Sequence, residues 1–195
     1  MSKFILASQS PRRKTLLVWA ELPFEIIVSA ANEDYPSSLS TEEVPVFIAK
    51  NKAAAVKEKI MQDKGEIHNT CIIAADTVVV LDQQIIGKPL DEQDAIASLQ
   101  KLSGRVHQVI TGVVLLYNEK EIAFSETTQV EFHTLTQEQI EFYVSKYKPY
   151  DKAGGYAIQE WIGVVGIKSI QGDFYNVMGL PVSKLMQKIK QLGIS

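Results

Sequence analysis

Two acidic residues, Asp76 and Glu33, could do chemistry as a pair, and their sequence contexts differ. Asp76 interrupts the apolar run IIAADTVVVL, and a carboxylate inside a central strand is costly unless it is paired, bound to a metal or at the sheet edge. Asp76 is therefore a candidate general base or metal ligand. The alternative is that the strand ends at Ala75 and that Asp76 and Thr77 form a surface turn, which the apolar residues beyond them disfavour. Glu33 lies in a polar loop, where an acid alone carries no signal.

The segment SQSPRR, from Ser8 to Arg13, combines a tight turn with a helix start. Ser10 suits the N-cap and Pro11 the first helical position, so the free N–H groups at this helix end can bind an anion. Arg12 and Arg13 oppose the helix dipole in the first turn, and an external anion would relieve that conflict. The alternative is an ordinary capped helix with solvated arginines.

Lysines near turns and helix edges are candidates for contact with phosphate. Lys52 flanks the apolar stripe of a predicted helix, but Lys57 flanks its other side equally well, and periodicity does not choose between them. Either residue can be a surface lysine whose stem packs on apolar neighbours. Lys88 lies between Gly87 and Pro89, which stiffen the turn around it, although an ordinary loop lysine explains this position equally well.

The segment YDKAGGYAIQ, residues 150–159, joins permissive backbone to polar side chains. Gly154 and Gly155 allow a ligand to approach the backbone closely, with Lys152 beside them. Gln159 carries an amide that both donates and accepts, as recognition of a base edge requires. Taken alone, a turn that leads into a strand is the simpler interpretation.

Several familiar sites are absent from the sequence. There is no GxxxxGK[ST] phosphate loop and no GxGxxG dinucleotide motif. The three histidines are scattered, so no Ser/His/Asp or Cys/His set is formed, and His107 is expected to be structural. Cys71 is the lone cysteine and lies in an apolar run, where a buried small hydrophobe is the expected role.

Composition limits the class of protein. The 195 residues are 46% hydrophobic and 22% charged, which is enough for the core of one domain. A net charge of −3 argues against general nucleic-acid binding. The first apolar run is too short for a signal peptide and no stretch approaches a membrane span, so we expect a cytoplasmic protein that does not contact membranes.

Hydrophobic periodicity predicts a mixed α/β fold. Strands are expected at residues 3–8, 24–29, 71–81, 106–117, 122–133 and over most of 158–170, with a short hairpin partner at 84–87. Helices are expected at residues 11–20, 46–61, 91–102, 136–147 and 181–192, and Thr136 with Gln139 forms a capping box for the fourth. Because long strands are adjacent in the chain and no linker divides it, the prediction is one domain over residues 1–195, with a mixed sheet flanked by helices.

Taken in series, eight blocks of the sequence resemble the Maf family of nucleotide pyrophosphatases. They are FILASQSPRR, the loop carrying Glu33, AKNKA, IIAADTVV, GKP, LSGRVHQVITGV, YDKAGGYAIQ and FYNVMGLP. The resemblance implies a mixed twisted sheet flanked by helices, with two lobes and a central cleft, related to the inosine triphosphate pyrophosphatases. It also implies release of nucleoside monophosphate and pyrophosphate with the help of Mg²⁺ or Mn²⁺.

The resemblance further implies roles for individual residues. Glu33 and Asp76 would hold the metal, and Asp76 would also deprotonate the attacking water. Triphosphate contacts would come from cations and from the serine turn: Arg13, Lys52, Lys88, Lys152, Ser8 and Ser10. The subgroup acting on dTTP and UTP has an Arg, a Thr and a Gln at the positions of Arg12, Thr77 and Gln159, which would read the pyrimidine edge.

Two other functions remain open at this point. The subgroup acting on 7-methyl-GTP differs at these three positions, and a purine or 7-methyl-GTP pyrophosphatase is the alternative within enzymes. A different class is a non-catalytic, nucleotide-sensing regulator of septum formation, after which the family is named. A homodimer is compatible with either function.

Overall fold

The chain divides into two compact units, and neither is one continuous stretch of sequence. The computed structural model describes residues 2–65 and 68–194. Unit 1 comprises Met1–Asp76, Thr111–Glu126 and Gly179–Ser195, and unit 2 comprises Thr77–Ile110 and Thr127–Met178. The division does not separate consecutive domains along the chain, and one domain over residues 1–195 stays a prediction.

The strands form a mixed sheet, as the sequence predicts. Within the described residues it has seven strands in the order β2-β1-β3-β5-β6-β7, and β4 pairs with β3. The strands are β1 (Lys3–Leu6), β2 (Glu25–Ile26), β3 (Thr70–Leu81), β4 (Gln84–Ile86), β5 (Val106–Tyr117), β6 (Lys120–Phe132) and β7 (Ile167–Gln171). β1 is parallel to β2 and β3, whereas β4 and β7 are antiparallel to β3 and β6. Strands β3, β5 and β6 each run from one unit into the other.

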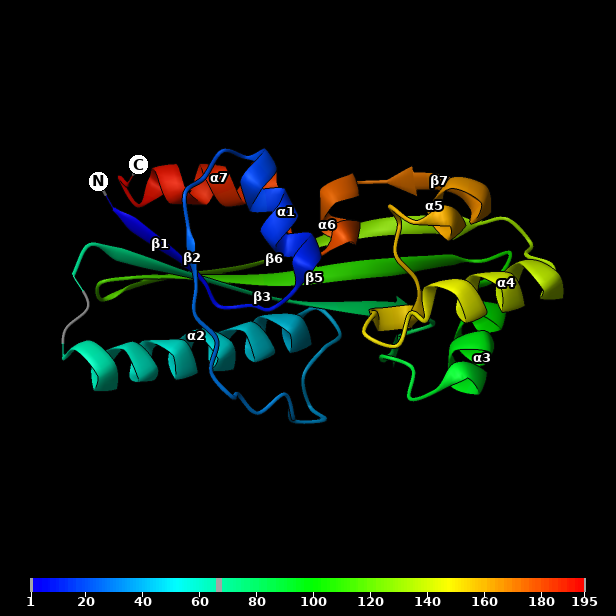
Figure 1. The fold of residues 1–195 in the computed structure, drawn as a ribbon, viewed down its shortest axis with the longest axis horizontal. Coiled ribbons are helices and arrows are strands. Elements are labelled where there is room, and N and C mark those ends of the chain that lie inside the picture. The colour runs from blue at the N-terminus through cyan, green and yellow to red at the C-terminus, as the bar shows by residue number, and fades with distance from the viewer. Residues whose placement is uncertain (1, 66–67, 195) are drawn as a thin grey trace. The chain divides into compact units, whose positions relative to one another are not determined.

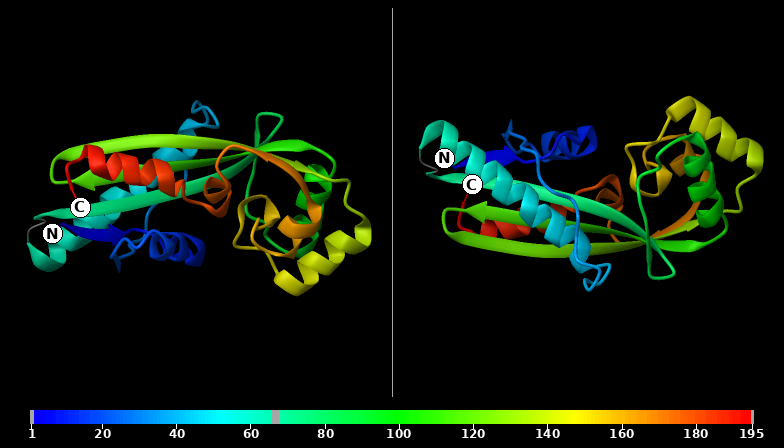
Figure 2. Two further views of the ribbon diagram at one scale, coloured as in Figure 1. Left: turned by 90° about the horizontal axis from the view of Figure 1, so that it is seen from above. Right: turned by 90° about the horizontal axis from the view of Figure 1, so that it is seen from below.

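Unit 1 packs helices on both faces of its strands. Its helices are α1 (Pro11–Trp19), α2 (Glu43–Lys64) and α7 (Val182–Gln191), and α2 and α7 lie on opposite faces (Figures 1 and 2). The buried stripe of α2, which includes Ala49, Ala53 and Val56, packs against β1, β3 and β5. Gly112 in β5 permits this approach, because a Cβ there would lie 2.2 Å from the backbone nitrogen of Val46.

Unit 2 has its own apolar core. Its helices are α3 (Glu92–Leu102), α4 (Gln137–Tyr147), the short 3-10 helix η1 (Ala153–Gly155), α5 (Trp161–Gly166) and α6 (Phe174–Met178). Leu99 and Leu102 of α3 meet Tyr143 of α4 and Phe132 of β6 in one buried cluster. The helices of this unit therefore cover its strand segments and support the turn at η1.

Most predicted elements are confirmed. Ser10 caps α1 and Pro11 is its first residue, and the capping box of Thr136 and Gln139 begins α4. The predicted strand over residues 71–81 is β3, in which nearly every residue is buried. Cys71 is fully buried, as expected for a small hydrophobe.

Three predictions about elements are wrong in extent or type. The strands at residues 3–8 and 24–29 shrink to β1 and to the two residues of β2. The strand predicted over 158–170 is instead helix α5 followed by β7. Ile162 and Gly166, four residues apart, are buried while Val164 is 81% exposed, which is a helical pattern that β-branched residues disguise. Helix α6 lies in a segment for which the sequence predicts no helix or strand.

None of the helices in the described parts of the chain is both long and apolar enough to cross a bilayer.

Candidate active site

Asp76 lies inside strand β3 and not in a turn. The strand continues from Thr70 to Leu81, so the alternative of a strand ending at Ala75 is wrong. Only 9% of Asp76 is exposed, and its Oδ1 accepts a hydrogen bond of 2.7 Å from Lys52 Nζ. The costly buried carboxylate is thus paired with a cation, as its position in the sequence requires.

Lys52 joins both predicted acids. Its Nζ lies 2.8 Å from Glu33 Oε1 and 2.7 Å from Asp76 Oδ1. The three side chains come from a loop, from helix α2 and from strand β3, so tertiary packing of unit 1 brings them together. An ammonium with both carboxylates within 3 Å is a strong electrostatic arrangement when two of its three members are mostly buried.

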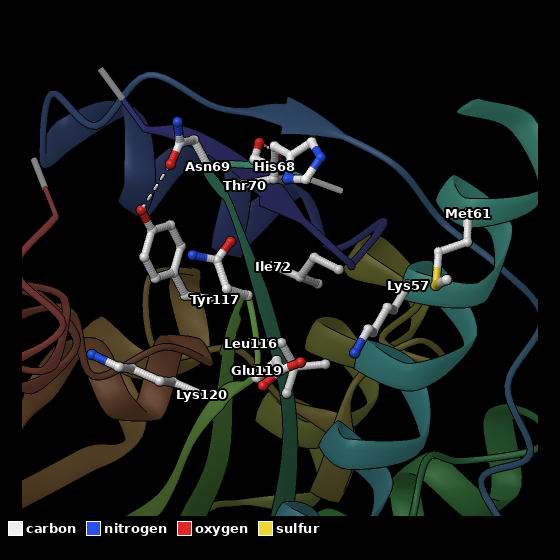
Figure 3. Close-up of a pocket in the computed structure, with 11 residues that line it drawn as sticks. Lys57, Met61, His68, Asn69, Thr70, Ile72, Leu116, Tyr117, Glu119 and Lys120 are labelled. Carbon is white, nitrogen blue, oxygen red and sulfur yellow. Dashed lines mark hydrogen bonds between the residues drawn. The ribbon is translucent and has the colours of Figure 1, made fainter. Parts of the chain in front are cut away.

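The alternative lysine of α2 has a different place. Lys57 points into a separate groove of about 1010 Å³ in unit 1, which Ile72 and Leu116 also line (Figure 3). At the edge of this groove Tyr117 donates a hydrogen bond to Asn69 Oδ1 (Figure 3). The choice that periodicity left open is therefore made by the fold, and Lys52 is the lysine at the acids.

The SQSPRR turn fixes one arginine firmly. Arg13 is 8% exposed, and its Nε donates to the carbonyl oxygen of Gly179 at 2.8 Å. Its Nη1 donates to Ser8 Oγ at 3.1 Å, and the Ser10 N–H donates to the same hydroxyl oxygen at 3.2 Å. The interpretation of two solvated arginines is wrong for Arg13, whereas Arg12 is half-buried.

The charges of the two acids act on the pKa of Arg13. Burial lowers the pKa of Arg13, the charges of Asp76 and Glu33 act in the opposite direction, and neighbouring Arg12 lowers it further. Guanidinium stays protonated in proteins even so. We call the group of Ser8, Arg13, Glu33, Lys52 and Asp76 the ion cluster.

The ion cluster has the donors that a hard divalent cation prefers. One oxygen of each carboxylate lies within 2.8 Å of the same atom, Lys52 Nζ, so both acids face a common position. Mg²⁺ and Mn²⁺ take oxygen ligands, and Mg²⁺ commonly uses one or two carboxylates with water and substrate phosphate completing the shell. Across the residues with described positions, no group of three or more His, Cys, Asp or Glu side chains could hold a metal. The residues present therefore fit a two-carboxylate metal site and not a closed cage.

In unit 2 the two turns that carry predicted lysines touch. The N–H of Gly154 donates to the carbonyl oxygen of Gly87 at 3.0 Å, and a Cβ on Gly155 would meet the Pro89 ring at 3.2 Å. Gly154 and Gly155 both have positive φ values, which glycine adopts without strain. Lys88 is exposed on this double turn.

Lys152 is held differently from Lys88. It is buried and lies between two acids, with Nζ 2.8 Å from Asp151 Oδ1 and 3.6 Å from Glu160 Oε1. The Tyr143 hydroxyl donates to Glu160 and accepts a hydrogen bond of 3.1 Å from the N–H of Ala157. Lys152 thus belongs to a network that fixes residues 151–160.

Sequence reasoning missed the supports of this segment. Tyr143 and Glu160 carried no motif of their own. His107 is 2% exposed and its Nε2 lies 2.7 Å from Tyr156 Oη. Burial lowers the pKa of His107 to about 4 and raises that of Tyr156. The expectation that His107 is structural agrees with this position, and the alternation of its strand was the available signal.

The three residues expected to read the base fall in different units. Arg12 belongs to unit 1, whereas Thr77 and Gln159 belong to unit 2. Gln159 is exposed and directly follows the buried segment Tyr156–Ile158. Their joint role stays a prediction, as does the cleft that the resemblance implies.

Comparison with known proteins shows what the chain as a whole is similar to. The dTTP/UTP pyrophosphatase of Parabacteroides distasonis is 47% identical over 96% of this chain and 95% of its own length. The dTTP/UTP pyrophosphatase of Porphyromonas gingivalis strain W83 is 47% identical over 99% of this chain and 96% of its own. The solved Ham1 protein of Staphylococcus aureus covers 67% of this chain and 72% of its own at 16% identity, with a TM-score of 0.44, a likeness too low to establish a relationship. The family model described as Maf-like protein matches residues 3–192, and the chain belongs to this family.

Proposed function

We propose that this protein is a dTTP/UTP pyrophosphatase, which hydrolyses a pyrimidine nucleoside triphosphate to the monophosphate and pyrophosphate. The ion cluster is the observation that carries the proposal, because it places a buried carboxylate beside fixed cations in unit 1. Relatives of nearly equal length and 47% identity bear the same activity in their names.

The cluster's residues suit hydrolysis of a phosphoanhydride. Asp76 would orient the attacking water and accept its proton, since it is a carboxylate that the backbone of strand β3 holds in a mostly buried position. Arg13, fixed by Gly179 and Ser8, would stabilise negative charge that develops as the α–β bond breaks. Preorganisation matters here because donors that are already fixed do not reorganise during the reaction.

Glu33 and Asp76 are the residues that would hold a divalent metal. When bound, Mg²⁺ or Mn²⁺ would act as a Lewis acid that neutralises phosphate oxygens. The fit rests on the two carboxylates that already share the Lys52 ammonium.

The remaining residues have proposed roles in binding. Lys88 would contact phosphate from its rigid turn, which the Gly154 N–H supports. Arg12, Thr77 and Gln159 would read the carbonyl and N–H edge of uracil or thymine, and Ser8 and Ser10 would complete the phosphate side. For Lys152 the two ion pairs favour support of the turn before Gln159 over direct contact with substrate.

Product analysis tests the proposal. The purified protein is incubated with dTTP, UTP, CTP, GTP or 7-methyl-GTP in the presence of Mg²⁺ or Mn²⁺, and monophosphate and pyrophosphate are quantified. We expect dTTP and UTP to be hydrolysed well above the others, with pyrophosphate and not orthophosphate as product. Preference for 7-methyl-GTP would favour the alternative enzyme, and nucleotide binding without turnover would favour the sensing regulator.

A further inference from the structure

Lys52 occupies the place between the two acids. Its ammonium lies within 2.8 Å of one oxygen from Glu33 and within 2.7 Å of one from Asp76. The Lys52 and Asp76 side chains are 17% and 12% exposed, so little water screens this pair, whereas Glu33 is 50% exposed. The contact is therefore strongest on the buried side.

The charges of the ion cluster are balanced without any added cation. Glu33 and Asp76 contribute two negative charges, and Lys52 and Arg13 contribute two positive charges. A divalent cation that joined the same carboxylates would lie a few ångströms from the ammonium, and like charges at that distance repel strongly where water is scarce. Lys52 and a metal ion therefore compete for the acids.

From this competition we propose that Lys52 is an internal counter-ion that holds the metal position in the free enzyme and swings to the triphosphate when metal and nucleotide bind together. The inference rests on the proposed function, which supplies the metal and the nucleotide. The long stem of lysine lets its ammonium change partners without movement of α2. The two carboxylates exchange the ammonium for the metal ion, while the displaced ammonium forms an ion pair with a phosphate of the nucleotide.

Coupling between the two ligands follows from this exchange. Binding of the metal ion alone breaks the ion pairs between the Lys52 ammonium and the two carboxylates, and no other anion replaces them for Lys52. The metal ion alone therefore binds the free enzyme weakly. Nucleotide with metal compensates the displaced ammonium, so each ligand strengthens the binding of the other. This coupling limits binding of metal ions to the two acids when no nucleotide is present.

Mn²⁺ titration of the full-length protein, followed by electron paramagnetic resonance without nucleotide, tests the proposal. Lys52→Met removes the competing charge, and we expect it to bind Mn²⁺ about tenfold more tightly than the unmodified protein, within the usual range of coupling between sites. Lys52→Arg keeps the charge and should bind as weakly as the unmodified protein. Lys57→Met is the matched control, since that lysine lies on the same helix and lines a different groove.

A second measurement, in which Lys52→Met should bind its ligand more weakly, distinguishes removal of the competing charge from damage to the site. With saturating Mn²⁺, Lys52→Met should bind the non-hydrolysable analogue α,β-methylene-UTP more weakly, because the phosphate has lost its ammonium. A misfolded site would weaken both ligands, which would overturn the proposal. The gain in Mn²⁺ affinity should vanish in Lys52→Met combined with Asp76→Asn, and its persistence there would place the metal elsewhere and also overturn it.

These results are independent of turnover. If the unmodified protein released no pyrophosphate from dTTP or UTP but Lys52→Met bound Mn²⁺ more tightly, the proposed function would be refuted and the competition between Lys52 and metal would stand. If the unmodified protein turned over dTTP and UTP but Lys52→Met bound Mn²⁺ with unchanged affinity, the counter-ion role alone would be refuted.

Discussion

Each unit contains a lysine between two carboxylates, yet the two arrangements differ in origin. In unit 1, Lys52 joins acids from a loop and a strand, with both distances below 3 Å. In unit 2, Lys152 joins its neighbour Asp151 at 2.8 Å and Glu160 at 3.6 Å, all within one short segment. Glu160 also accepts a hydrogen bond from the Tyr143 hydroxyl, so neighbouring groups of unit 2 provide partners for this carboxylate.

This difference favours a functional role for the arrangement in unit 1 and a purely structural role for the arrangement in unit 2. Acids brought together from distant elements cost more to arrange than acids along one turn, because loop closure and desolvation both oppose them. A buried ion pair is weak evidence for stability, so the costly arrangement in unit 1 favours a functional explanation. The local arrangement in unit 2 needs no more than the holding of residues 151–160.

Neutralising one acid in each unit should produce the largest contrast. Asp76→Asn keeps the shape but removes the proton acceptor, and we expect kcat on UTP to fall about a hundredfold or more. Glu160→Gln, the matched change in unit 2, should alter kcat by less than about fivefold, the usual worth of one hydrogen bond. Steady-state rates on proteins with matched circular dichroism check this. Similar losses in both variants would erase the distinction between the units.

Acid should weaken unit 2 through His107. Its pKa is lowered by burial to about 4 from an ordinary value near 6.5, so the unfolded chain takes up a proton that the folded chain refuses. Above pH 6.5 the ring is neutral in both states and does not reduce the free energy of unfolding. As the pH falls toward 4, protonation of the unfolded chain lowers that free energy. The loss should reach about 3 kcal/mol.

Denaturant unfolding between pH 7 and pH 4 measures this effect. His107→Gln preserves a partner for Tyr156 but does not titrate, so the difference in slope between the two proteins isolates the histidine from the carboxylates. Parallel curves would show that His107 has the same pKa in the folded and the unfolded chain, which would contradict the effect of burial.

Base selection should depend on Gln159 and leave the ion cluster untouched. Its amide offers an acceptor and a donor together, which matches the C=O and N–H edge of uracil and mismatches cytosine. Gln159 is exposed in the free protein, so its amide loses water only when a base covers it. Gln159→Ala should reduce the discrimination between UTP and CTP in kcat/KM by about 1–3 kcal/mol, because the covered base edge is then left without a partner. Rates for UTP, CTP and GTP on both proteins decide it, and an unchanged ratio would contradict the role.

The smallest effect concerns the two lysines of unit 2. Lys88→Ala removes an exposed charge and should weaken all triphosphates alike, by at most about 1 kcal/mol. Lys152→Ala should instead lower the unfolding free energy, since Glu160 loses a cation. Binding of UTP and GTP analogues and chemical denaturation separate these outcomes, and an effect of Lys88→Ala on one base only would exclude a phosphate contact.

Local signals predicted much of the fold, and long-range packing explains what they missed. Ser10 with Pro11, and Thr136 with Gln139, determine helix starts through neighbouring atoms, and both helices begin there. Asp76 was identifiable because burial of a charge leaves a visible break in an apolar run. The choice of Lys52 over Lys57 depends on contacts with β3 and a loop, which no periodicity contains.

The support network of unit 2 could not be read from the sequence for the same reason. Tyr143 and Glu160 lie in ordinary helical and turn sequence, and their partnership appears only when α4 packs beside residues 157–160. The error at α5 arose because β-branched residues favour strands locally, whereas burial of Ile162 and Gly166 made the segment helical.

The hydrogen bond from Arg13 to Gly179 has a consequence for biosynthesis. It joins residues 166 positions apart, and the last segment of unit 1 begins at Gly179. During translation Arg13 therefore lacks this acceptor until Gly179 has been synthesised. An arginine that is buried in the folded unit 1 thus obtains the acceptor of its Nε only when the third segment of that unit has been added.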